Sequence, residues 1–404
     1  MTDKRLTLLI SLLIFSLLAV QPVSGQDGQN ARTAQPIMIG VPLPLTGSLS
    51  PFGIMMRNSF EMALKKINQA GGVKGRPLEL IYGDNGGDPA RGRHVIKEMV
   101  NDYGVRMLVG GYASTPTYAM AKTAHRLDVP YLICTAAADR ITQKGWKNIF
   151  RMNAPISEYT KGLEEFWIRN YRPKSMAIIY ENSMFGTNGA TRMMGFCREY
   201  AIDIHSLIGY PADKADPLHF RPMLAPLTHE PPDVVYMVSY LEDAVALVRE
   251  LRALKINALL CGGAGGFTQE AFVKKAGKAA EGLLTATLWS KESGYPGGGQ
   301  YYDEYVKTYS GAPDYHGVEA YSALLVVRDA LERAASFGPA DIREALGSTF
   351  MMTPFGPVKF YNYEMFERQN SPRTKVLQII DGKYKCIWPP DLATARFVPP
   401  EPLK

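Results

Sequence analysis

Short apolar segments alternate with amphipathic segments along most of the chain. The apolar run Ile37–Val41 predicts a buried strand, and a loop rich in Pro, Gly and Ser follows it as far as Gly53. Apolar residues at helical spacing then predict a helix over 55–68, which Gly71 and Gly72 end. The alternation continues with predicted strands at 78–82, 107–109 and 131–134, and predicted helices at 94–101 and 117–127.

The same pattern of strand and helix starts again near residue 176. It predicts strands at 176–180, 234–238 and 258–260, and helices at 187–200, 241–254 and 268–277. Repeated β-α units predict a parallel sheet that is covered by helices on both faces. With 404 residues the chain suits two cores, so we expect an α/β protein with two similar lobes, each a doubly wound parallel sheet.

A last block of the chain is too small to form a third core. It contains predicted helices at 300–309 and 317–336 and a strand-rich tail with strands at 358–360 and 376–380. We expect this block to divide between the two lobes.

Small residues fill the loops at the carboxyl ends of the predicted strands, where ligands bind in sheets of this kind. Gly, Ser, Thr and Ala let backbone N–H groups approach a ligand closely. These loops cover residues 43–53, 111–117, 134–140, 181–187, 239–242 and 261–267. In one of them Ser114, Thr115 and Pro116 directly precede a helix, which fits a simple helix cap or a carboxylate site at the helix N-terminus. Thr135–Ala138 fits a close backbone approach or an ordinary turn.

Three aromatic residues lie in loops that would face the cleft between the lobes. They are Phe52, Phe185 and Tyr240. An exposed aromatic side chain often marks a contact surface, although isolated ones are common. Three of them on converging loops would form an apolar pocket of the kind that small ligands use.

The first 25 residues differ in character from the rest of the chain. Lys4 and Arg5 precede an apolar run from Leu6 to Val20, and small residues follow it. This run is shorter than the roughly 20 residues that a membrane span needs. The segment therefore predicts a secretory signal that is cleaved near Gly25, without a lipid anchor.

Composition and charge exclude several classes of protein. Hydrophobic residues make up 46% of the chain and charged residues 21%, which predicts a globular protein. The formal charge of +6 is spread without a basic patch, so we expect no nucleic-acid partner. The spacing of the four cysteines predicts no metal site, and it leaves their disulfide state open. They are Cys134, Cys197, Cys261 and Cys386.

The chain also lacks the motifs of cofactor binding and catalysis. Gly262–Gly266 does not keep the spacing of a dinucleotide fingerprint, and there is no phosphate-binding loop of the Walker type. Neither a nucleophile elbow nor a zinc-protease motif is present, and the histidines have no partner motif. We therefore predict no enzyme activity, no cofactor and no metal.

A series of short motifs resembles one family closely. It begins with Ile39–Gly47 (IGVPLPLTG), Phe52-Gly53 and Ile67–Pro77 (INQAGGVKGRP), and continues with Asp84 and Asp88-Pro89. Further matches are Gly110–Thr115, Val129–Ile133, Phe150-Arg151, Phe185-Gly186, Asp233–Tyr236, Ala280–Leu283 and Glu319–Tyr321. These motifs resemble the type I periplasmic binding proteins of the branched-chain amino acid and amide transport family, over essentially the whole mature chain.

The resemblance implies two lobes with three crossovers between them, near 153–157, 288–292 and 353–357. The first lobe would contain 36–155 and 290–354, and the second 156–289 and 355–404. Family members close on their ligand by hinge motion. The closed form then docks on the membrane permease of an ATP-driven importer. We accordingly expect a monomeric periplasmic protein that captures an amino acid, an amide or an organic acid.

The resemblance also implies roles for individual residues. Ser114 and Thr115 would hold a ligand carboxylate with the N–H groups of Ala136 and Ala137. Phe52 would contact the ligand side chain, and Phe185 and Tyr240 would cover the ligand from the second lobe.

The sequence departs from the family pattern where members that bind amino acids hold the ammonium group. The loop at Gly263 lacks the expected acid, and so does the segment at Ile156-Ser157. Glu319, Glu181 or Glu242 could substitute, although none matches the pattern, and a buried ammonium group without an acidic partner is costly. We therefore hypothesise that the ligand is a carboxylic acid, an amide or another non-standard ligand. A periplasmic sensor of amides, urea or aromatic acids that is not coupled to transport is the alternative.

Overall fold

Two seven-stranded sheets with flanking helices make up the protein. The structure is a computed structural model that describes residues 35–211, 217–309 and 311–400, and residues 35–404 belong to one compact unit. The predicted signal at 1–25 lies outside the described residues. In spatial order the first sheet contains β13 (Tyr361–Tyr363), β14 (Phe366–Gln369), β5 (Ile149–Arg151), β4 (Tyr131–Ile133), β3 (Met107–Gly110), β1 (Ile37–Leu43) and β2 (Leu78–Asp84).

The second sheet repeats this order for its first five strands along the chain and differs in the two strands that follow. It contains β16 (Lys383–Trp388), β15 (Lys375–Ile380), β10 (Leu284–Thr287), β9 (Leu259–Gly262), β8 (Val234–Val238), β6 (Ser175–Glu181) and β7 (Asp203–Tyr210). In each sheet the five strands that come first along the chain are parallel. The second sheet ends in the antiparallel pair β15 and β16. A small separate sheet pairs β11 (Phe350–Thr353) with β12 (Gly356–Lys359).

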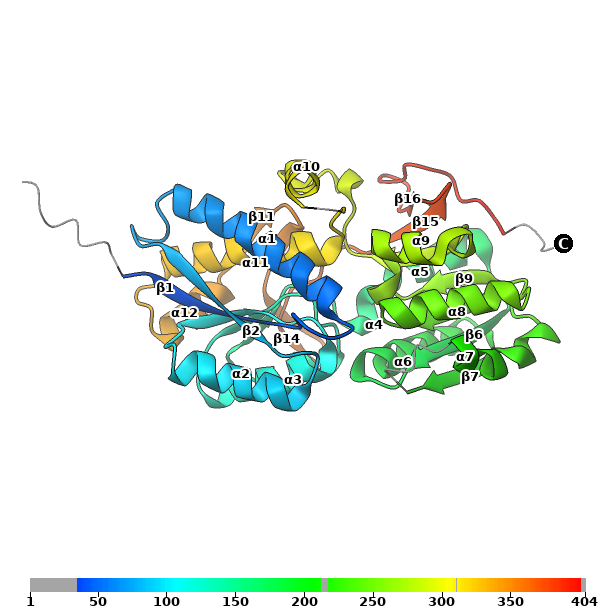
Figure 1. The fold of residues 1–404 in the computed structure, drawn as a ribbon, viewed down its shortest axis with the longest axis horizontal. Helices are drawn as coiled ribbons and strands as arrows, with labels where there is room; N and C mark the ends of the chain where they lie inside the picture. Colours follow the sequence, from blue (N-terminus) through cyan, green and yellow to red (C-terminus); the bar gives the residue numbers. More distant parts are fainter. Residues whose placement is uncertain (1–34, 212–216, 310, 401–404) are drawn as a thin grey trace, which may run out of the picture. The chain divides into compact units, whose positions relative to one another are not determined.

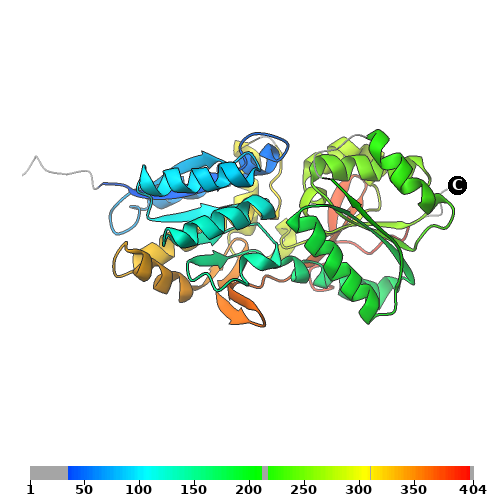
Figure 2. The ribbon, with the colours of Figure 1, turned by 90° about the horizontal axis from the view of Figure 1, so that it is seen from below.

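Helices cover both faces of each sheet (Figures 1 and 2). On the first sheet, α1 (Ser50–Gln69) packs against α11 (Tyr315–Arg333) on one face, and α2 (Pro89–Asn101) packs against α3 (Ser114–Arg126) on the other. The second sheet is flanked by α5 (Lys161–Phe166), α6 (Met184–Glu199), α7 (Pro217–Leu224), α8 (Leu241–Ala253) and α9 (Glu270–Ala276). The remaining helices are α4 (Ile156–Tyr159), α10 (Gly298–Thr308) and α12 (Pro339–Gly347).

These findings confirm the predicted fold class. Most predicted elements are present, but several helices begin three to five residues earlier than their apolar spacing indicates. α1 begins at Ser50-Pro51 and α2 at Pro89, because proline suits the first helical turn, where its missing N–H is not needed. The Asp88 carboxylate caps α2 by accepting a hydrogen bond from the Arg91 amide at 2.6 Å.

One part of the predicted division between lobes differs from the sheet pairing. The stretch 355–404 was assigned to the second lobe, yet β14 pairs with β5 of the first sheet through Gln369 and Arg151. Polar side chains explain the pairing, because Gln369 accepts a hydrogen bond from the buried Arg151 guanidinium at 2.7 Å. The other boundaries of the two lobes stay a prediction.

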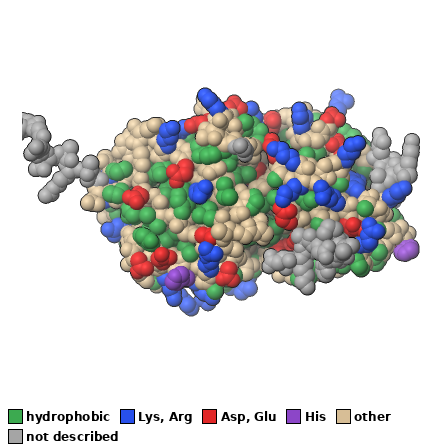
Figure 3. All heavy atoms as spheres, in the orientation of Figure 1, with side chains coloured by type: hydrophobic (Ala, Val, Ile, Leu, Met, Phe, Trp, Pro, Cys, Tyr) green, Lys and Arg blue, Asp and Glu red, His purple; other side chains and the backbone are tan. Residues whose placement is uncertain are grey.

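The distribution of charge, the helices and the cysteines bear on three further expectations from the sequence. Basic and acidic side chains are interspersed on the face that Figure 3 shows. Within the described ranges, no helix is both long and apolar enough to cross a bilayer. All four cysteines are buried and unpaired, so the disulfide that the sequence left open is not formed in this structure.

Candidate functional site

In each sheet, the strand order reverses at one point. At this point the helices that follow two adjacent strands diverge to opposite faces and leave a crevice for a ligand. In the first sheet the point lies between β1 and β3, and in the second between β6 and β8. We call these two places the first and the second switch point.

The first switch point is closed by a stack of aromatic rings. Phe52 of α1 stacks on Tyr112 with 4.5 Å between ring centroids and 19° between planes. The imidazole of His316 meets both rings, at 5.0 Å from Phe52 and 5.3 Å from Tyr112. Phe52 is fully buried and Tyr112 is 5% exposed. Phe52 therefore lies in the first turn of α1 and not in a loop as the sequence predicted, and its ring forms part of an apolar wall.

The second switch point also carries an aromatic pair. Phe185 at the start of α6 packs on Tyr240 at the start of α8, with 5.5 Å between centroids. Tyr240 in turn lies 5.8 Å from Tyr112 of the first sheet. The two predicted aromatics of the second lobe and the predicted aromatic of the first lobe thus belong to one continuous cluster of rings.

The N-terminus of α3 faces this cluster. Burial raises the pKa of Tyr240 well above its ordinary value, and the nearby backbone of Ser114 lowers it in part. The Ser114 hydroxyl accepts a hydrogen bond from the Ala138 amide at 3.1 Å. The Thr115 hydroxyl accepts one from the Met184 amide of α6 at 3.4 Å. Ser114 and Thr115 therefore connect three loops, and the helix terminus lies within reach of the second sheet.

The loop around Ala136 and Ala137 is held from behind by a buried cation. The guanidinium of Arg151 donates hydrogen bonds to the carbonyl of Ala136 at 3.3 Å and to that of Ala138 at 2.8 Å. Its other donors bond Gln369 at 2.7 Å and the Thr142 hydroxyl at 2.8 Å. All four acceptors are neutral. Burial lowers the pKa of Arg151 to about 10, so the group keeps its charge at neutral pH.

Glu319 lies on α11, one helical turn after Tyr315. It is fully buried, and among the described residues neither of its carboxylate oxygens has a hydrogen-bond partner. Burial raises its pKa well above the ordinary value, against the opposing effect of Arg151. An isolated carboxylate in this place would be costly, and the protonated form avoids that cost.

Position 263 requires glycine for a steric reason that the sequence does not reveal. A Cβ atom at this position would lie 2.3 Å from the Tyr236 hydroxyl, and one at Gly266 would lie 2.4 Å from the Tyr240 carbonyl carbon. The glycines after β9 therefore let this loop pass directly over two tyrosines. This close packing explains the Gly-rich run better than a nucleotide site does.

Four residues that sequence reasoning did not single out also belong to the site: Tyr112, Asp314, His316 and Arg151. Asp314 caps α11 by accepting a hydrogen bond from the His316 amide at 2.9 Å. Its carboxylate also bonds the Nδ1 atom of His316. It accepts a third hydrogen bond, at 2.7 Å, from the hydroxyl of Thr268, which lies in a loop of the second sheet. An aspartate before a long apolar helical run signals a cap, which is the pattern that could have identified Asp314.

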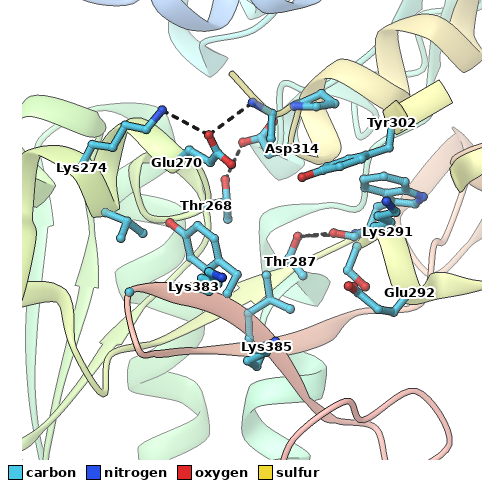
Figure 4. Close-up of a pocket in the computed structure, with 18 residues that line it drawn as sticks. Thr268, Glu270, Lys274, Thr287, Lys291, Glu292, Tyr302, Asp314, Lys383 and Lys385 are labelled. Atoms are coloured by element: carbon cyan, nitrogen blue, oxygen red, sulfur yellow. Dashed lines mark hydrogen bonds and ion pairs between the residues drawn. The ribbon is translucent and has the colours of Figure 1, made fainter. Parts of the chain in front are cut away.

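One cavity borders the ring cluster at Tyr240, and a second borders Asp314. One of about 750 Å³ lies between loops of both sheets. Its walls include Leu49, Gly86, Thr115, Glu181, Ser183, Tyr240 and Asp243. The other, of about 500 Å³, lies on the side of α9, α10 and β16. Figure 4 shows Thr268 and Asp314 pointing toward each other at its edge, and Tyr302 pointing into it. Over the described ranges, no group of three or more potential ligand side chains could hold a metal ion.

Comparison with known proteins agrees with this architecture. A family model described as "Periplasmic binding protein" matches residues 36–382. The leucine-, isoleucine-, valine-, threonine- and alanine-binding protein of Pseudomonas aeruginosa is 27% identical over 86% of this chain and 94% of its own length.

Solved structures share the fold at lower identity. The branched-chain amino acid transporter substrate binding protein of Streptococcus pneumoniae, in complex with isoleucine, matches with a TM-score of 0.79 at 22% identity, over 86% of this chain and 97% of that one. A solute binding protein of an ABC transporter from R. palustris, in complex with benzoate, matches with a TM-score of 0.77 at 17% identity, over 91% and 99%.

Proposed function

The chain belongs to the periplasmic binding protein family, and from this premise we propose that it captures a small carboxylate-bearing ligand between its two lobes for an ABC importer. The family is one of solute-binding proteins and not of enzymes. We further propose that the chain is exported to the periplasm, delivers its ligand to a membrane permease and acts as a monomer.

One observation carries the proposal of a carboxylate ligand. The N-terminus of α3 and the loop 136–138 meet at the Ser114 hydroxyl, and the charged Arg151 lies directly behind that loop. The amide groups of a helix N-terminus and a nearby cation both favour an anion. Because the guanidinium bonds neutral acceptors, its charge can stabilise an anion on the opposite side of the loop.

The ring cluster supports an apolar body for the same ligand. Phe52, Tyr112, Tyr240 and Phe185 meet where the two switch points face each other. Aromatic rings bury flat or branched apolar groups well. Two of the related proteins named above bind amino acids such as isoleucine, and the third binds benzoate. Aromatic acids and branched amino acids are therefore the two classes to compare.

The residues that we propose to contact the ligand come from both lobes. From the first come Phe52, Ser114, Thr115, Ala136, Ala137 and Glu319, and from the second come Phe185, Tyr240 and Gly263. The carboxylate would lie against Ser114, Thr115 and the alanine amides. The rings would enclose the rest.

Titration calorimetry of the mature chain tests this proposal. Benzoate, L-leucine and benzamide would be compared as probes, with Ser114→Ala as the site variant and Thr191→Ala, an exposed threonine of α6, as the control. We expect Ser114→Ala to weaken carboxylate binding about tenfold, because a hydrogen bond to a charged group contributes roughly 1.5–3 kcal/mol. Thr191→Ala should leave the affinity unchanged. Equal affinity for benzoate and its neutral amide, or no binding of either acid, would contradict the proposal.

A further inference from the structure

We propose that Glu319 is a specificity-determining residue that is protonated in the closed cleft, so that the site excludes an ammonium group and binds an anionic ligand together with a proton. This inference rests on the proposed function, because it concerns the same site. It identifies the chemical feature of the ligand that the site selects.

The position of Glu319 supports this role. Glu319 is a residue of α11 with a fully buried carboxyl group, and neither oxygen has a hydrogen-bond partner among the residues that the structure describes. His316, which touches Phe52 and Tyr112, precedes it by one helical turn on the same face. Glu319 therefore lies beside the ring cluster and has capacity to bond a ligand.

The charged and titratable groups around Glu319 come from four elements. Arg151 ends β5 and favours the ionised form, whereas Asp314, the cap of α11, opposes it. Cys134 after β4, Tyr159 of α4 and Tyr315 of α11 also lie within electrostatic range. Arg151 forms no ion pair with Glu319, because its donors bond neutral acceptors. Burial therefore prevails, and the pKa of Glu319 is raised well above its ordinary value.

A protonated carboxyl group discriminates between the two ligand classes. A buried ammonium group needs an ionised partner, and a neutral Glu319 does not provide one. A ligand carboxylate beside an ionised Glu319 would place two like charges in one buried site, which raises the pKa of one of them. With Glu319 protonated, its O–H can donate to the carboxylate, and the single remaining negative charge faces Arg151.

Calorimetry in two buffers with different ionisation enthalpies measures the proton that accompanies binding. Benzoate and L-leucine would be titrated from about pH 5 to pH 9, so that the series starts near the ordinary carboxyl pKa and extends well above it. The variants are Glu319→Gln, a neutral isostere, and Glu344→Gln, which changes an exposed glutamate of α12. For the wild type and Glu344→Gln we expect benzoate binding without proton uptake at pH values where Glu319 of the free protein is already protonated. Above the pKa of Glu319 in the free protein we expect proton uptake and an affinity that falls up to about tenfold per pH unit.

For Glu319→Gln we expect benzoate affinity within about threefold of the wild type at the lowest pH, without proton uptake and without the pH dependence. The inference is wrong if L-leucine is the tighter ligand and Glu319→Gln weakens it tenfold or more, because Glu319 would then be an ionised partner of the ammonium group. Unchanged proton uptake in Glu319→Gln would also overturn it.

Unfolding without any ligand separates this inference from the proposed function. A carboxyl group whose pKa is raised on folding contributes stability that is present below its unfolded-state pKa and is lost as the pH rises through the folded-state pKa. Urea unfolding should therefore show the wild type losing stability relative to Glu319→Gln as the pH rises. Parallel pH profiles would refute a protonated Glu319 even if benzoate binds, whereas diverging profiles without binding of either acid would refute the proposed function alone.

Discussion

The two sheets share the order of their five parallel strands and an aromatic pair at the switch point, but they differ in the cation that is buried in each. In the first sheet Arg151 fixes the loop that borders the proposed carboxylate position. In the second sheet Lys375 of β15, also fully buried, donates to the carbonyl of Leu288 at 2.9 Å. Each sheet thus buries one cation, an arginine in the first sheet and a lysine in the second.

The chemistry of the two side chains explains this difference. A guanidinium group has a delocalised charge and several donors, so it tolerates burial among neutral acceptors, whereas an amine loses its proton readily when buried. Burial lowers the pKa of Arg151 to about 10 and that of Lys375 to about 8. Arg151 therefore keeps its charge to a higher pH than Lys375, which begins to lose its proton near pH 8. The more persistent charge lies in the first sheet, where we place the ligand carboxylate.

Replacing Arg151 should have the largest effect. Arg151→Met leaves two backbone carbonyls, Gln369 and Thr142 without their buried donor, so we expect a loss of about 3–5 kcal/mol in the free energy of unfolding. Urea unfolding measures it. Arg328→Met, at an exposed position of α11, is the control and should cost less than about 0.5 kcal/mol. Similar losses in both variants would show that the buried network does not hold this sheet edge.

Lys375 gives a pH-dependent counterpart in the second sheet. Because its pKa is about 8 in the folded protein and 10.5 for an unperturbed lysine, the unfolded chain binds more protons between these values, and stability should rise with pH across this window. Relative to Lys375→Met, the wild type should gain up to about 3 kcal/mol from pH 8 to pH 10.5. Lys307→Met, exposed on α10, should follow the wild type, and a flat difference between Lys375→Met and the wild type would contradict the prediction.

The loop after β9 depends on close packing more than on charge. Gly263→Ala would place a methyl group 2.3 Å from the Tyr236 hydroxyl, so we expect a loss of about 1–3 kcal/mol in thermal or urea unfolding. Gly195→Ala adds the same methyl group on α6, where nothing lies within 4 Å, and should stabilise by about 0.5–1 kcal/mol. Equal free energies of unfolding for Gly263→Ala and Gly195→Ala would show that the loop can shift to make room for the methyl group.

The sequence predicts the fold better than the site, for identifiable reasons. Apolar periodicity locates strands such as β1 and β8, which are buried on both faces, and helices such as α8. It misses β5 and β14, because three or four residues carry no period and their pairing depends on Arg151 and Gln369. At the site, the sequence identifies Ser114 and Phe52 because both follow predicted strands closely. The partnership of Asp314 and Thr268 joins positions 46 residues apart, and no local pattern encodes it.

The two tyrosines that meet across the switch points offer the smallest but most direct comparison. Within the described part of the chain the Tyr112 hydroxyl is buried without a hydrogen-bond partner, whereas the Tyr240 hydroxyl lies near the Ser114 backbone, which lowers its pKa in part. Tyr112→Phe removes an unsatisfied group and should be neutral or slightly stabilising in urea unfolding, and Tyr240→Phe should cost about 1 kcal/mol.

Binding measurements separate the roles of the two tyrosines further. If the ligand bonds the free hydroxyl, Tyr112→Phe weakens benzoate binding several-fold although it does not destabilise the protein. Tyr240→Phe frees the Ser114 amide for the ligand carboxylate and should leave affinity unchanged or higher. If Tyr112→Phe were less stable than Tyr240→Phe, the Tyr112 hydroxyl would have a hydrogen-bond partner. Tyr240 would then not occupy the proposed carboxylate position at the N-terminus of α3.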